Sequence, residues 1–333
     1  MLNPSAVESS TKSVQTPVRR RRPSAEPAYL SRSPTIDVTL EVHGIHPVRA
    51  RISGDEADPP ALVLGGISAD RRIRRWWPEI TGAEGALSAD RFRLLSIDWP
   101  EPGENGIATT DDLADLLAAV LDALNVARVE VFVGASFGAM VGLSFAARHS
   151  DRIGRLVAIS GAHRSTPAAT AGRLIQRRII ESLARLGNPA QGVALARSLA
   201  LTSYRPASLF DQRFFDADPV ETLSRIEQYF DHNGTRFSDR FDAGRYLALS
   251  SALDRHCVDP TLVRCRAELI GVTSDRLVPV SQLRELAGAI GIRARLHLID
   301  SPFGHDAFLK STDLLNPLLK SLLNAPGGDD HHE

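Results

Sequence analysis

The sequence is poor in cysteine and has no long apolar run. Its only cysteines are Cys257 and Cys265. Two residues do not make a disulfide framework and no zinc-ligand spacing surrounds them, so we expect two buried free thiols and no metal site. No stretch reaches the roughly 18 apolar residues that span a bilayer, and the first residues lack the apolar core of a secretory signal. The sequence therefore predicts a cytoplasmic protein that does not bind a membrane.

An excess of charge of either sign is also missing. The 333 residues include 39 Lys and Arg against 40 Asp and Glu, a formal net charge of -1. Nucleic acids and anionic membranes attract strongly basic surfaces, so this balance argues against both as partners. The length, with 43% hydrophobic and 24% charged residues, suits one large α/β domain with an insertion, or two domains.

The order of local patterns divides the chain into three parts. Residues 1–35 are rich in Ser, Pro and Arg and cannot bury enough apolar surface to offset chain entropy, so they predict a disordered tail. Residues 36–163 and 256–325 alternate apolar strands with helical patterns. This alternation predicts an α/β core with a mostly parallel central sheet and helices on both faces. Residues 164–255 contain helical patterns alone and predict a helical lid inserted into this core.

Periodicity predicts the individual elements. Strands are expected over residues 36–43, 48–52, 61–64, 92–97, 129–133, 155–159, 265–272 and 294–299. Helices are expected over residues 140–147, 171–186, 191–201, 220–230, 243–253 and 307–323. A further helix begins near Thr110, whose hydroxyl is expected to cap its N-terminus.

The segment Gly134-Ala135-Ser136-Phe137-Gly138 stands between an expected strand and an expected helix. In that context, G-x-S-x-G is typical of a nucleophilic serine on a sharp strand-to-helix turn. Gly134 and Gly138 leave room for the tight backbone. The first N–H groups of the helix point at the site and favour a developing anion. We therefore predict that Ser136 is a nucleophile.

Two later loops predict the partners that such a serine needs. A serine hydroxyl is activated by a base, usually a histidine that a carboxylate orients. In folds with this turn, the acid follows a later strand and the histidine lies in the last strand-to-helix loop. Asp275 and His305 occupy those places, in the order Ser, Asp, His.

A tetrahedral intermediate also needs N–H donors for its oxyanion. We expect one donor from Phe137, directly after the serine. The second is expected from Gly66, in the glycine pair that follows the short strand at residues 61–64.

Several segments resemble motifs of the homoserine O-acyltransferase family, the MetX type of the α/β-hydrolase superfamily. The carrying segments are residues 134–140, 273–279 and 304–309, with weaker matches at residues 76–78, 90–92 and 192–197 and at Tyr204. The resemblance extends over roughly residues 37–323. It implies the α/β-hydrolase fold with an inserted helical lid.

The resemblance implies Ser136 as nucleophile, Asp275 as the orienting acid and His305 as general base. It implies an acyl-CoA:L-homoserine O-acyltransferase of methionine biosynthesis, which works by a ping-pong mechanism through an acyl-enzyme on Ser136. Acyl-CoA is then a co-substrate, and no permanently bound cofactor is expected.

Further roles are implied for the substrate. Arg197 is expected to clamp the homoserine carboxylate, because a guanidinium group presents a bidentate fork that fits a carboxylate. Asp306, beside the base, suits the substrate ammonium, and Tyr204 is expected to line the same site. Lids of this family also form dimer contacts, so a homodimer through the lid is implied.

The choice of donor and acceptor rests on departures from the family pattern. The loop at residues 98–106 is short, and Leu201 stands where a lid histidine is usual. A succinyl group carries a carboxylate that needs a cation when buried. Besides Arg197, the lid region carries Arg164, Arg173, Arg177, Arg178, Arg185 and Arg205. We therefore favour succinyl-CoA over acetyl-CoA.

Three other functions stay open. Serine is an alternative acceptor, and an esterase would use the same triad with water. A noncatalytic binding protein is a third possibility, against which the intact set of Ser136, Asp275 and His305 argues.

Overall fold

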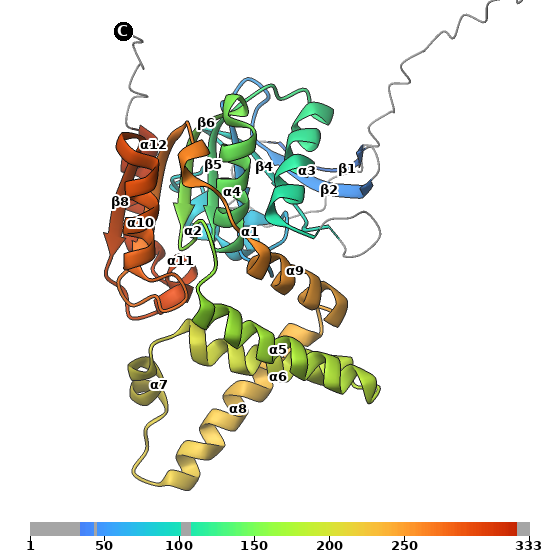
Figure 1. Ribbon diagram of the computed structural model, residues 1–333, viewed down its shortest axis with the longest axis vertical. Helices are drawn as coiled ribbons and strands as arrows, with labels where there is room; N and C mark the ends of the chain where they lie inside the picture. Colours follow the sequence, from blue (N-terminus) through green and yellow to red (C-terminus); the bar gives the residue numbers. More distant parts are fainter. Residues whose placement is uncertain (1–33, 43–44, 101–107, 325–333) are drawn as a thin grey trace, which may run out of the picture.

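The computed structural model describes residues 34–42, 45–100 and 108–324. They form one eight-stranded sheet covered by helices, and a group of helices extends from one end of it (Figure 1). The predicted N-terminal tail lies outside the described residues as far as position 33. Most of the short loop at residues 98–106 also lies outside them.

The strands agree closely with those expected from periodicity. They are β1 (Thr35–Val42), β2 (Ile45–Ser53), β3 (Pro60–Leu64), β4 (Arg93–Ile97), β5 (Val129–Ala135), β6 (Ile153–Ile159), β7 (Arg266–Val272) and β8 (Ala294–Ile299). Their order across the sheet is β1-β2-β4-β3-β5-β6-β7-β8. β2 pairs antiparallel with both β1 and β4, and the other pairings are parallel. The predicted mostly parallel sheet is confirmed.

Helices cover both faces of the sheet. The core helices are α1 (Ile73–Trp76), α2 (Pro78–Thr81), α3 (Thr110–Ala123), α4 (Phe137–Arg148), α10 (Val280–Ile290), α11 (Ala307–Lys310) and α12 (Thr312–Asn324). Along β5, Phe132 packs into the core formed with α3, α4 and α10, whereas Val131 and Val133 pack into the core formed with α2 and α12. Burial on both faces explains why the strand sequence is nearly continuously apolar.

The lid consists of five helices between β6 and β7. They are α5 (Pro167–Arg185), α6 (Pro189–Tyr204), α7 (Ala207–Phe214), α8 (Pro219–Ser238) and α9 (Ala243–Arg255). In Figure 1 they lie below the sheet, and α9 leads back to the core beside α3. The predicted fold class, an α/β-hydrolase fold with an inserted helical lid, is confirmed.

Helix α3 begins at Thr110 as expected, but its predicted capping residue and the predicted single C-terminal helix are wrong. The N-cap of α3 is Thr109, which is extended and whose side chain accepts a hydrogen bond from the backbone N–H of Asp112. Thr110 is the first helical residue, and its buried hydroxyl is bonded elsewhere. The single helix expected over residues 307–323 is two helices, α11 and α12. It breaks at Ser311, where ψ is 48° and the side chain is bonded to Ser301 Oγ at 2.7 Å.

Two further expectations need correction. Helices α1, α2, α7 and α10 are additional to the predicted set. Cys265 is buried as expected, but Cys257 is exposed. His256 and Val258 are buried on either side of it, and alternate residues of an extended segment point in opposite directions, so Cys257 faces outward.

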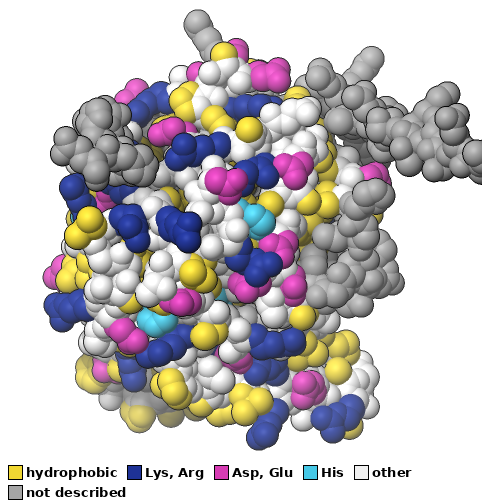
Figure 2. All heavy atoms as spheres, turned by 45° about the horizontal axis from the view of Figure 1, so that its top comes forward, with side chains coloured by type: hydrophobic (Ala, Val, Ile, Leu, Met, Phe, Trp, Pro, Cys, Tyr) yellow, Lys and Arg dark blue, Asp and Glu magenta, His cyan; other side chains and the backbone are white. Residues whose placement is uncertain are grey.

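The surface reflects the balanced composition. Figure 2 shows Lys and Arg side chains interspersed with Asp and Glu over the visible face, without a large field of one sign. Within the described ranges, no helix combines the length and apolar character needed to cross a membrane.

A buried histidine directly after α9 connects the end of the lid to the core. His256 Nε2 lies 2.9 Å from the carbonyl oxygen of Ala162, and Nδ1 lies 2.7 Å from the hydroxyl of Thr110. A carbonyl only accepts, so Nε2 carries the proton, and Nδ1 accepts from Thr110. Thr110 accepts in turn from Ser144 at 2.9 Å. Burial lowers the pKa of His256 from 6.5 to about 4, so the network holds a neutral imidazole.

This network predicts a loss of stability in mild acid. Above pH 6.5 His256 is neutral in both the folded and the unfolded state, but between pH 6.5 and about 4 only the unfolded chain binds the proton. His256 should therefore contribute a loss of about 2 kcal/mol between about pH 7.5 and about pH 5. Urea unfolding of wild type and His256→Asn at both pH values measures it. Asparagine does not titrate, so the variant should show a shallower pH dependence, and equal slopes would contradict the assignment.

Candidate active site

The sequence around Ser136 folds into a turn that only small neighbours permit. Ser136 joins β5 to α4 with φ 55° and ψ -114°, a conformation that L-residues rarely adopt. A Cβ atom on Gly134 would lie 2.3 Å from the carbonyl oxygen of Gly138, and one on Gly138 would lie 2.3 Å from that of Leu64. The glycines therefore allow β5, α4 and the end of β3 to meet at Ser136.

Ser136, His305 and Asp275 form a continuous hydrogen-bonded chain. Ser136 Oγ lies 2.7 Å from His305 Nε2, and His305 Nδ1 lies 2.8 Å from Asp275 Oδ2. The other Asp275 oxygen accepts from the backbone N–H groups of Leu277 at 2.8 Å and Val278 at 3.1 Å, which fixes the carboxylate. A carboxylate that accepts from Nδ1 leaves Nε2 free to take the serine proton.

The surroundings of His305 favour proton transfer. Burial alone lowers its pKa, but the Asp275 carboxylate, with Asp306 nearby, offsets this effect and raises the pKa above its ordinary value. His305 is 7% exposed and Asp275 is 5% exposed. The base is therefore shielded from water while it remains bonded to its orienting acid.

The predicted oxyanion donors lie next to Ser136. Phe137 is the first residue of α4, so its N–H has no partner within the helix. A Cβ atom on Gly66 would lie 4.0 Å from Ser136 Cβ. The loop is held in place because Gly65 accepts from the Gly138 N–H at 2.9 Å and Gly66 accepts from Trp99 Nε1 at 2.9 Å. The positive end of α4 therefore faces the same space as the glycine loop.

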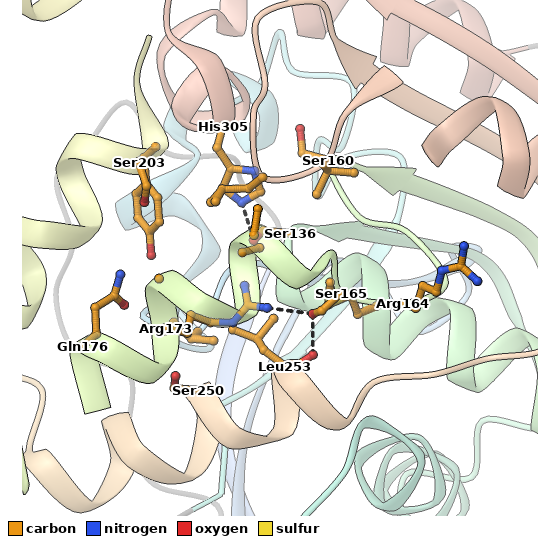
Figure 3. A pocket seen from close by; sticks show the side chains of 18 of the residues that line it. Ser136, Ser160, Arg164, Ser165, Arg173, Gln176, Ser203, Ser250, Leu253 and His305 are labelled. Carbon is orange, nitrogen blue, oxygen red and sulfur yellow. Dashed lines mark hydrogen bonds between the residues drawn. The ribbon is translucent and has the colours of Figure 1, made fainter. Parts of the chain in front are cut away.

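Two pockets meet at Ser136. We call one the Arg197 pocket and the other the Arg173 pocket. Both are lined by Ile67, Ser136, Tyr204, Tyr246 and His305. The Arg197 pocket is also lined by Gly66, Ser68, Arg197, Phe237, Asp306, Phe308 and Leu309. The Arg173 pocket extends under α5 and α9, and Figure 3 shows Ser136 and His305 in this pocket.

The remaining predicted site residues lie in the Arg197 pocket. The Arg197 guanidinium carbon is 5.4 Å from the ring centre of Tyr204 and 4.9 Å from that of Phe237. In the part of the chain that the structure describes, no Asp or Glu oxygen lies within salt-bridge distance of Arg197. Burial raises the pKa of Tyr204, so its hydroxyl stays protonated there. Arg197 thus presents an unpaired cation to the pocket.

Asp306 has a partner that the sequence did not reveal. Its Oδ2 accepts from Arg205 Nε at 2.9 Å, and Arg205 also donates to Tyr229. The sequence shows Arg205 only as one of several lid arginines, because 101 residues separate it from Asp306.

The lid arginines are not equivalent. Arg164 and Arg173 line the Arg173 pocket. Arg177 lies behind that lining, where it bonds to Ser250 and Asp254, and Arg178 and Arg185 are exposed. For the arginines on α5, the position along the helix decides which side chains face the pocket. This signal can be used only once the inward face of α5 is known. In the described ranges, no cluster of three or more His, Cys, Asp or Glu side chains forms a metal site.

Comparisons with known proteins identify the family of the chain. Residues 62–312 match the family model of the alpha/beta hydrolase fold. The chain is 40% identical over 294 residues to a homoserine O-succinyltransferase of Xanthomonas campestris pv. campestris, which covers 84% of this chain and 79% of that enzyme. It is 37% identical over 257 residues to a homoserine O-acetyltransferase of Thermus thermophilus, over 73% of this chain and 64% of that enzyme.

A solved structure shows the same fold. The homoserine O-acetyltransferase from Bacillus anthracis superposes with a TM-score of 0.77 at 15% identity, over 89% of this chain and 98% of that one. The fold and the strand-to-helix serine turn define an α/β-hydrolase. Within that class, the chain belongs to the homoserine O-acyltransferase family, whose members are acyltransferases, and the family resemblance of the motifs is confirmed.

Proposed function

We propose that the protein transfers an acyl group from acyl-CoA to the hydroxyl of L-homoserine, in methionine biosynthesis, through an acyl-enzyme on Ser136. The observation that carries this proposal is the hydrogen-bonded chain of Ser136, His305 and Asp275 at the junction of two pockets. The relatives named as homoserine O-succinyltransferase and O-acetyltransferase support the choice of substrates.

In the first half-reaction, Ser136 Oγ attacks the thioester carbonyl while His305 Nε2 takes its proton. The oxyanion is stabilised by the N–H of Phe137 and a second N–H from the loop at Gly66. Loss of one such donor typically costs about 10²–10³ in rate. The tetrahedral intermediate collapses, His305 returns the proton to the CoA sulfur, and the thiol leaves.

In the second half-reaction, homoserine occupies the Arg197 pocket. Arg197 binds the carboxylate, for which its unpaired guanidinium is suited, and Asp306 faces the ammonium with the oxygen that Arg205 does not hold. Tyr204 lines the same pocket beside His305, and the centres of their rings are 5.7 Å apart. His305 deprotonates the homoserine hydroxyl, whose oxygen attacks the carbonyl carbon of the acyl-enzyme. The tetrahedral intermediate collapses, the bond from the acyl carbon to Ser136 Oγ breaks, and His305 returns the proton to Ser136. The lid limits competing hydrolysis by excluding water.

We further propose succinyl-CoA as the preferred donor. The 40% identity to a succinyltransferase and the arginines that reach the Arg173 pocket support this choice. Acyl-CoA donors crossed with amino-acid acceptors, followed by mass spectrometry, test it. Faster transfer to serine than to homoserine would show that serine is the acceptor. Rapid release of the free acid without any acceptor would show that the protein is an esterase.

The nucleophile is tested by trapping the intermediate. Wild type incubated with acyl-CoA alone should gain one acyl group on the peptide that contains Ser136, and Ser136→Ala should gain none and lose about 10⁴-fold or more in kcat. The matched control is Ser198→Ala, because Ser198 bonds only to a carbonyl of its own helix and lines neither pocket. An acyl group on another residue would refute the assignment.

The acceptor clamp is tested by Arg197→Lys. Lysine keeps the charge but loses the bidentate fork, so the homoserine KM should rise about 10-fold or more. The rate of acyl-enzyme formation, measured by rapid quench without acceptor, should stay within about twofold, because the first half-reaction does not use the clamp. Arg178→Lys, on an exposed site, is the control. An equal effect on both half-reactions would argue that Arg197 acts on the lid as a whole.

We also propose a homodimer through the lid. Large apolar side chains on the lid are exposed: Leu174, Ile175, Leu186, Leu195, Phe215, Val220 and Leu223. A concentration of exposed large apolar side chains on one inserted segment favours an interface there. Sedimentation velocity should give a dimer for wild type and a monomer for Leu195→Glu combined with Phe215→Glu. The control is Ile292→Glu, at a site 99% exposed outside the lid. A monomeric wild type would refute the proposal.

A further inference from the structure

Each of the two pockets at Ser136 contains a guanidinium group that faces its interior. Under the proposed function, Arg197 binds the acceptor, and no single residue of the Arg173 pocket has yet been assigned to the donor. Arg173 extends from α5 into that second pocket, where Figure 3 shows its side chain passing beneath Ser136 toward Ser165.

The contacts of Arg173 leave one nitrogen available. Its Nε donates to Asp254 Oδ1 at 2.7 Å and its Nη2 donates to Ser165 Oγ at 2.8 Å. Nη1, which carries two N–H donors, has no hydrogen-bond partner among the residues that the structure describes. The side chain is only 13% exposed, so bulk water is not its main surrounding.

The charge around Arg173 is not balanced. Asp254 accepts from Arg173 through Oδ1 and from Arg177 through Oδ2, at 2.7 and 2.6 Å. Two guanidinium groups therefore share one carboxylate. No Asp or Glu is found among the described residues that line the Arg173 pocket. A mostly buried cation without its own counter-charge is costly, and a bound anion removes that cost.

The side from which the reacting groups approach the carbonyl decides which part of the donor enters this pocket. The CoA sulfur leaves and the homoserine oxygen attacks at the same carbonyl carbon, and both exchange a proton with His305 Nε2. They must therefore approach from the same side of the acyl-enzyme. Since the acceptor lies in the Arg197 pocket, the acyl chain extends from Ser136 into the Arg173 pocket.

We propose that Arg173 binds a carboxylate at the far end of the acyl chain and thereby selects dicarboxylic acyl donors over monocarboxylic ones. Asp254 and Ser165 hold two of its nitrogens, so Nη1 is oriented before the donor arrives, and Arg177 holds the other oxygen of Asp254 in place. This inference rests on the proposed acyl-enzyme at Ser136 and names the residue that distinguishes its donors.

Two donors of matched length isolate this contact. Succinyl-CoA and butyryl-CoA have four-carbon acyl chains that differ at the end, which is a carboxylate in one and a methyl group in the other. Wild type should favour succinyl-CoA in kcat/KM with homoserine. Arg173→Gln should lower kcat/KM for succinyl-CoA about 10- to 100-fold, which is the range for a hydrogen bond to a charged group. The value for butyryl-CoA should change less than about threefold.

Two further variants separate recognition from folding. Arg173→Lys keeps the charge and should retain part of the succinyl preference. Arg178→Gln, on the exposed side of the same helix, should change neither donor. Thermal unfolding of each variant checks that the lid is intact.

The possible outcomes are distinguishable. An equal loss for both donors in Arg173→Gln, or no loss for either, would overturn the inference while transfer by wild type upholds the proposed function. A wild type that prefers butyryl-CoA would also overturn it. Absence of transfer to homoserine from any donor in wild type would instead refute the proposed function itself.

Discussion

The turn between β5 and α4 is the constraint on which the site depends. Ser136 has a backbone conformation that is unfavourable for a residue with a side chain, at φ 55°. It persists because the turn is held from several sides. Its N–H donates to the carbonyl oxygen of Ile159 at 2.8 Å, and Gly138 donates to Gly65 at 2.9 Å. The buried parallel strands β3, β5 and β6 thus fix the position of one hydroxyl oxygen.

The lid is held against the catalytic loop by close backbone packing and by an ion pair. Gly304 has φ 56°, and a Cβ atom on it would lie 2.4 Å from the carbonyl oxygen of Tyr204. The end of α6 therefore lies against the residue before His305. The ion pair between Arg205 and Asp306 holds the same two segments together. The helix α6, which also carries Arg197, is thus packed directly against the loop that carries the base.

The two pockets give the site a chemical asymmetry. Arg197 lies over two aromatic rings and has no carboxylate partner among the described residues, whereas Arg173 is oriented by Asp254 and Ser165. A guanidinium without a carboxylate partner can pair with an incoming anion. An anchored one presents a single nitrogen in a fixed direction. The arrangement suits an acceptor that enters after each acylation and an acyl chain that stays attached to Ser136.

Local sequence rules were enough for the central features. The strand, glycine turn and helix around Ser136 are adjacent in the chain, and Asp275 and His305 lie in the loops that follow their strands. The position of each of these side chains at the site could therefore be predicted from neighbouring residues. The tertiary structure decided what depends on docking. Arg173 and Arg178 look alike in sequence, and only the orientation of α5 against α9 turns the first toward the pocket. The hydroxyl of Thr110 bonds to His256, 146 residues away, a partner that no local pattern indicates. Short-range patterns determine which elements form, but the partner of a side chain depends on surfaces that meet only after the chain has folded.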